Sequence, residues 1–163
     1  MRASLVLPLL LASLPALGDT RPSLCLAGEA AVFSCATGGK IASLCASAEI
    51  GPGRGSLTYR FGRKGAVELT HPAAPLPPDQ AFSAAVVGDA GSAGDILRFS
   101  RGEIGYTLYS IIVKGRGERE GVLVTRNGTR LADLPCKGTA LGSDGWQRVY
   151  RARLPKAEPA WLP

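Results

Sequence analysis

Apolar and polar residues alternate with a period of two along most of this chain, which is the pattern of half-buried β-strands. The clearest case is Leu57-Thr-Tyr-Arg-Phe61, whose three apolar side chains share one face. Other strand-like runs occupy residues 31–35, 41–47, 66–70, 81–87, 96–100, 106–113 and 121–134. Glycine or proline turns separate these short runs. The pattern predicts an all-β fold, a small antiparallel sandwich or barrel of about eight strands.

The run from 106 to 113 differs from the others, because apolar residues occupy both of its alternating faces. This predicts a central strand that is covered on two sides. Asn127-Gly128 predicts a two-residue hairpin turn, since both positions of a type I′ turn need positive φ. The register that follows from this turn places Val124 opposite Leu131.

Two segments break the strand pattern. Residues 72–79 contain four prolines, which predicts an extended crossover without ladder hydrogen bonds. Near the C-terminus, Asp144 followed by Gln147 resembles a capped helix start. In such a short helical turn Trp146 and Tyr150 lie four residues apart and share one face.

The first 18 residues have the features of a secretory signal peptide: a basic start, a short apolar core and a small-x-small cleavage site. We expect residues 19–155 to form a single β domain and residues 156–163 a flexible tail. No apolar run reaches the roughly 20 residues of a membrane-spanning helix. The expected location is therefore the periplasm or the secreted fraction, with no transmembrane segment.

The even number of cysteines predicts two disulfides in an oxidising compartment. The four cysteines are Cys25, Cys35, Cys45 and Cys136. A two-residue turn at 38–39 places Cys45 opposite Val32, with its sulfur on the other face from that of Cys35. A Cys35–Cys45 bridge is therefore the poorest connectivity, and Cys136 is expected to pair with either Cys35 or Cys45. The spacings lack the close cysteine pair of a metal site.

The charge of the chain is moderately basic. Without the leader, 18 lysines and arginines remain against 13 acidic residues, a net charge of +5. Such a surplus favours anionic partners such as phosphates, anionic glycans or carboxylate-lined clefts. The basic residues are scattered without a run of five, so no nucleic acid partner is expected.

Catalytic signatures are weak. His71, the only histidine, lies in the proline-rich connection, and no nucleophile motif accompanies it. Glu118 and Glu120 lie in a charged run that has the composition of a solvated turn. We therefore expect no enzyme, no cofactor and no metal site.

One loop carries a family resemblance. Ser100-Arg-Gly-Glu-Ile-Gly-Tyr106 resembles the Ser-Gly…Tyr loop of bacterial periplasmic lysozyme inhibitors, except that Arg101 stands between the serine and the glycine. In that family a β-barrel or sandwich inserts this loop into the lysozyme cleft, where polar side chains engage the catalytic carboxylates. The resemblance implies contacts from Ser100 and Tyr106, a loop shaped by Gly102 and Gly105, and Arg101 within the binding site.

The whole chain also resembles a group of exported four-cysteine bacterial β proteins without assigned activity, through the motifs F-S-C, G-K, S-L-C-A-S and Y-R-F-G. Two hypotheses follow. The first is a monomeric, non-enzymatic exported binding protein that inhibits a cell-wall hydrolase. The alternative is a structural or envelope-associated β protein that binds an anionic surface through its arginines.

Overall fold

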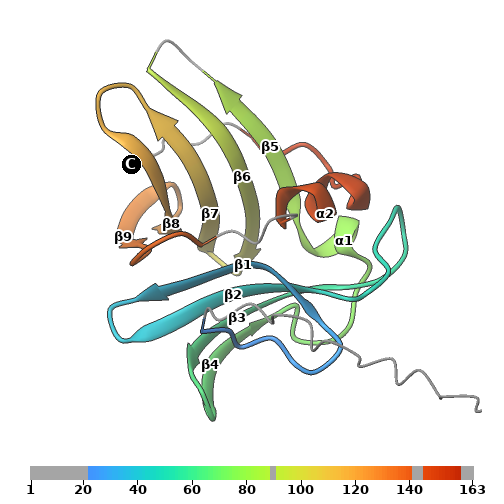
Figure 1. Cartoon of the computed structure of the whole chain (residues 1–163). Coiled ribbons are helices and arrows are strands. Elements are labelled where there is room, and N and C mark those ends of the chain that lie inside the picture. The colour runs from blue at the N-terminus through green and yellow to red at the C-terminus, as the bar shows by residue number, and fades with distance from the viewer. Residues whose placement is uncertain (1–21, 89–90, 141–144, 159–163) are drawn as a thin grey trace, which may run out of the picture.

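The computed structural model describes residues 22–88, 91–140 and 145–158, and these residues form two antiparallel sheets (Figure 1). The four-stranded sheet contains β1 (Ala30–Thr37), β2 (Lys40–Ala46), β3 (Leu57–Arg63) and β4 (Ala66–His71). The five-stranded sheet contains β5 (Ser83–Gly88), β6 (Ser92–Arg101), β7 (Ile104–Val113), β8 (Gly117–Arg126) and β9 (Thr129–Pro135). Two short helices, α1 (Pro78–Ala81) and α2 (Gly145–Ala152), complete the chain. The all-β prediction, including the short C-terminal helix, is confirmed.

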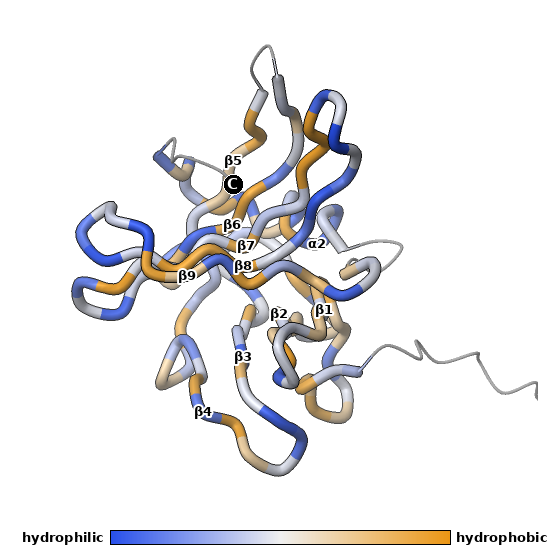
Figure 2. Tube along the Cα trace, turned by 90° about the vertical axis from the view of Figure 1, so that its left-hand side faces the viewer, coloured by the Kyte–Doolittle hydropathy of each residue, from blue (hydrophilic) through white to orange (hydrophobic). Residues whose placement is uncertain are grey.

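The main core lies between the two sheets, whose strands cross each other in Figure 1. Both sheets contribute large, fully buried side chains to it: Phe33, Leu44 and Tyr59 from the first, and Leu97, Leu108 and Val122 from the second. Figure 2 shows hydrophilic residues gathered at hairpin turns and hydrophobic ones along the strands between them. The alternation in the sequence therefore places one face of each sheet in this core.

The central position of β7 is confirmed. β7 lies between β6 and β8, and both of its faces are covered. Leu108 points into the core between the sheets, while Tyr109 and Ile111 belong to a second buried cluster. Ala157, from beyond α2, joins this second cluster and is 2% exposed.

Residues 156–158, expected in a flexible tail, pair with the edge of the five-stranded sheet. The backbone N–H of Ala84 donates to the carbonyl of Pro155, and the N–H of Ala157 donates to the carbonyl of Ala84, both at 2.9 Å. A parallel bridge joins Ala84 and Lys156. Residues 159–163 lie outside the described residues.

Two predicted registers are wrong, each because a β-bulge adds one residue to a strand. In β9 the extra residue is Leu131, so that Val124 lies opposite Ala132 instead of Leu131. In β1 the extra residue is Val32, and Cys45 therefore lies opposite Ala31. Both turns have the predicted two residues, so each register holds only as far as the bulge.

The proline-rich crossover is not extended throughout, because its last residues form α1. Pro78 is the first residue of this helix, where a proline loses no intrahelical hydrogen bond and its fixed φ suits the helix. Ala81, expected to begin a strand, ends α1 instead, and β5 starts at Ser83.

Both disulfides form, Cys35–Cys136 and Cys25–Cys45. The prediction that Cys136 joins the first hairpin, and that Cys35 and Cys45 are not bridged, is confirmed. Cys35 pairs with Ala42, three residues before Cys45, so the two sulfurs still lie on opposite faces despite the bulge. Two disulfides indicate an oxidising compartment.

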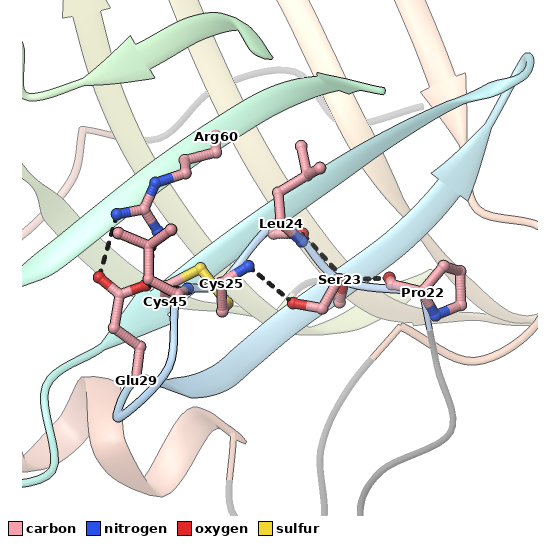
Figure 3. The surroundings of a disulfide bond; sticks show 10 residues. Pro22, Ser23, Leu24, Cys25, Glu29, Cys45 and Arg60 are labelled. Carbon is pink, nitrogen blue, oxygen red and sulfur yellow. Dashed lines mark hydrogen bonds and ion pairs between the residues drawn. A yellow bond between two sulfur atoms is a disulfide. The ribbon is translucent and has the colours of Figure 1, made fainter. Parts of the chain in front are cut away.

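The segment from Pro22 to Glu29 lies along the four-stranded sheet as a strap (Figure 3). Ser34 donates to the carbonyl of Pro22 at 2.7 Å, and the N–H of Leu24 donates to the hydroxyl of Ser43 at 3.0 Å. Besides the Cys25–Cys45 disulfide, an ion pair secures this strap, with Arg60 donating to both carboxylate oxygens of Glu29 at 2.6 and 3.0 Å. The predicted leader lies outside the described residues. Within them, no helix has the length and hydrophobicity needed to cross a bilayer.

Candidate functional site

The predicted seven-residue loop at 100–106 is a tight hairpin. Ser100 pairs with Gly105 and Arg101 pairs with Ile104, so the turn consists of Gly102 and Glu103 alone. Gly102 has a φ of +57°, which fits a turn with glycine at its first central position. The expectation of a longer loop is wrong because both strands continue to the turn.

The five predicted site residues therefore divide into a tip and a base. Ser100, Arg101 and Gly102 are exposed at the tip, whereas Gly105 and Tyr106 are half-buried residues of β7. A Cβ at Gly105 would lie 2.8 Å from the Thr125 hydroxyl oxygen, so this glycine permits a close approach between β7 and β8.

Tyr106 is part of an aromatic stack below the tip. The stack consists of Tyr59, His71, Phe82, Phe99 and Tyr106, gathered from both sheets and the α1 connection. The Tyr106 ring lies parallel to that of Phe99, with centroids 4.7 Å apart, and His71 stacks on Phe99 at 4.3 Å. Tyr59 is 5.0 Å from Phe99 and is fully buried. The stack anchors the base of the hairpin to the core, which makes Tyr106 an anchor for the tip.

His71 is a structural member of this stack. Its Nε2 lies 3.0 Å from the carbonyl oxygen of Ala81, and the edge of its ring meets Phe82. Burial lowers the pKa of His71; its hydrogen bond to Ala81 opposes this effect, and the nearby Arg101 guanidinium adds to it. A neutral imidazole that donates to a carbonyl suits a packing role.

A second turn lies beside the first. The backbone N–H of Asn127 donates to the carbonyl of Glu103 at 3.2 Å, and Arg126 pairs with Ile104. Asn127 and Gly128 both have positive φ, 48° and 80°, as a type I′ turn requires. We call this surface the paired turns; its exposed polar residues are Ser100, Arg101, Glu103, Arg126 and Asn127.

Glu120 is buried, although its charged neighbours in the sequence suggested a solvated turn. It lies on β8, is 8% exposed, and accepts a hydrogen bond of 2.5 Å from the backbone N–H of Ala140. Residues 136–140 also contact β1, through bonds of 2.8 Å from Ser34 to Ala140 and from Lys137 to Ala36. Glu120 therefore holds the segment 136–140, which joins the five-stranded sheet to β1 of the four-stranded sheet.

Cys25, Glu29 and Cys45 lie close enough together to suggest a metal site. Both sulfurs, however, are in the Cys25–Cys45 disulfide, and the carboxylate of Glu29 is paired with Arg60. This cluster therefore offers no thiolate to an ion.

Comparisons with family models, with curated proteins and with solved structures found no match to this chain.

Proposed function

We propose that this chain is an exported, non-enzymatic binding protein that inhibits a cell-wall hydrolase of the lysozyme type. The periplasm or the secreted fraction is its proposed location. In this proposal the paired turns enter the substrate cleft of the hydrolase, with Ser100 and Arg101 foremost.

The observation that supports this proposal most directly is the rigid presentation of the tip. Ser100 and Arg101 are exposed, yet the strands below them are held by the aromatic stack and by the bond between Asn127 and Glu103. A tip that is already ordered loses little conformational entropy when it binds. Narrow, projecting hairpins of this kind suit insertion into a cleft.

The chemistry of the tip suits a carboxylate-bearing cleft. Retaining and inverting glycosidases use a pair of carboxyl groups, one of which must be protonated to act as general acid. A guanidinium can donate two parallel hydrogen bonds to a carboxylate, and a hydroxyl can donate a third. A cation beside the general acid also lowers its pKa, so it holds that group in the deprotonated, inactive form. Arg101 would thus inhibit the reaction electrostatically while the turn excludes the glycan.

Titration of lysozymes from several structural classes with the mature protein tests the proposal. We expect at least one class to be inhibited stoichiometrically at micromolar protein, with modest weakening as salt increases, because a buried tip is shielded from screening. Inhibition of none of the classes would refute the proposal. The alternative, attachment to an anionic surface through the arginines, predicts no inhibition and binding that falls steeply with salt.

A further inference from the structure

A basic groove lies on another part of the molecule, between α2 and the turn at residues 50–54. It has a volume of about 570 Å³ and is lined by three exposed arginines, Arg54, Arg151 and Arg153, together with Tyr150. No acidic residue is among its described lining residues. These arginines belong to the scattered positive charge of the sequence, and the fold brings them together.

The two walls of this groove are fixed by backbone hydrogen bonds. Gly51 and Arg54 exchange two of them, at 3.2 and 3.0 Å, and so close the turn that carries Arg54. On the other wall, the N–H of Arg153 donates to the carbonyl of Tyr150 at 3.1 Å. Arg148 donates to the carbonyl of Ala48 at 3.4 Å and ties the helix to the segment before the turn. The negative end of a helix favours cations at Arg151 and Arg153, but it does not account for Arg54.

An apolar cavity of about 210 Å³ adjoins the groove, and Tyr150 and Arg153 line both. Its walls include Val86, Ile96 and Trp146, and Asp95, which accepts a hydrogen bond from Tyr150, also lines it. The indole Nε1–H of Trp146 is buried and meets no acceptor among the described residues. This nitrogen is fully enclosed by the protein, so it does not open into the cavity, and Trp146 lines the cavity with its other atoms.

We propose that the groove and the cavity together bind one small amphiphilic anion. Its oxyanion group lies among Arg54, Arg151 and Arg153, and its short apolar part lies beside Trp146. Tyr150, which is 45% exposed and donates to Asp95, forms the boundary between the two parts. This ligand class follows from the joining of a cationic groove to an apolar cavity, because a simple oxyanion would leave the cavity unused. The site is independent of the paired turns.

Octyl sulfate, kept below its micelle concentration, is a suitable probe. Trp161→Phe leaves Trp146 as the only tryptophan, so its emission reports on the cavity directly. We expect saturable one-to-one binding that is at least about tenfold tighter than that of inorganic sulfate or of neutral octyl glucoside. If inorganic sulfate binds as tightly as octyl sulfate, or if octyl glucoside does, the joint site is refuted.

Charge variants locate the anionic part. Arg54→Ser/Arg151→Ser/Arg153→Ser should weaken octyl sulfate binding at least about tenfold. The control variant Lys64→Ser/Lys114→Ser/Arg116→Ser removes the same charge from other exposed turns and should change affinity less than about twofold. Equal weakening by the two variants would refute the site. Should the first variant fold poorly, Arg54→Ser alone, outside the helix, must weaken binding by about threefold or more; no change would equally refute the site.

Discussion

Removal of the Cys35–Cys136 disulfide should cost more stability than removal of Cys25–Cys45. The first bridge spans 101 positions of the chain and the second spans 20. In the chain-entropy account a bridge stabilises by restricting the unfolded chain, by about 4.7 kcal/mol for the longer loop and about 3.3 kcal/mol for the shorter. The difference of about 1.4 kcal/mol is large enough to measure. Either loss is a substantial part of the roughly 5–15 kcal/mol typical of a domain.

The matched variants are Cys35→Ala/Cys136→Ala and Cys25→Ala/Cys45→Ala, because each removes one bridge and leaves no free thiol. Urea unfolding of both variants and of the oxidised parent gives the free energies. The dependence on urea should also steepen more in the first variant, since its unfolded chain expands further. After loss of the shorter bridge, the Arg60–Glu29 ion pair still holds the strap. The opposite order of stabilities would refute this reasoning.

Three further predictions concern polar groups that are buried or half-buried. Glu120→Ala should lower the free energy of unfolding by about 1–3 kcal/mol, because it leaves the N–H of Ala140 without its acceptor. Glu120→Gln keeps an acceptor and should lower the free energy of unfolding less, as measured by urea unfolding. The lowered pKa of His71 means that this residue binds a proton more readily in the unfolded chain than in the folded protein. The free energy of unfolding should therefore fall as the pH is lowered from about 7.5 to about 5.5, and it should fall less in His71→Phe. An identical fall in both proteins would contradict this. Burial raises the pKa of Glu29, but hydrogen bonds from Arg60 and Leu26 outweigh this effect and lower the pKa. Arg60→Ala should therefore speed amide hydrogen exchange in the strap. Unchanged exchange would show that the disulfide alone holds the strap.

The elements of the fold were predictable because alternation, turn residues and strand length all agree locally. Leu57, Tyr59 and Phe61 contribute to the core as their spacing indicates, and Asn127-Gly128 forms the predicted turn. The bulges at Val32 and Leu131 were not predictable, because a bulge responds to packing between sheets and leaves no mark in a period-two pattern.

The candidate site was predicted only in part. Its location at Ser100 and Arg101 followed from a motif. Whether Tyr106 belongs to the tip or is an anchor depends on its stacking with Phe99 across the hairpin and on His71 and Tyr59, and the last two are distant in sequence. The partnership with the Asn127 turn likewise depends on strand order. Glu120 was interpreted as a solvated residue because its charged neighbours dominate the local composition, whereas its burial comes from the chain at residue 140.

Comparison of Arg101→Ala with Arg116→Ala in a lysozyme inhibition assay tests the central claim most directly. Both arginines are exposed near hairpin turns, but Arg101 lies in the paired turns and Arg116 in the β7–β8 turn, so the two variants lose the same charge from different surfaces. We predict that Arg101→Ala weakens inhibition about 10- to 100-fold, as expected for a lost charge-assisted hydrogen bond in a buried cleft, and that Arg116→Ala changes it less than about twofold. Equal inhibition by the parent protein and Arg101→Ala would contradict the assignment of the paired turns as the inhibitory surface.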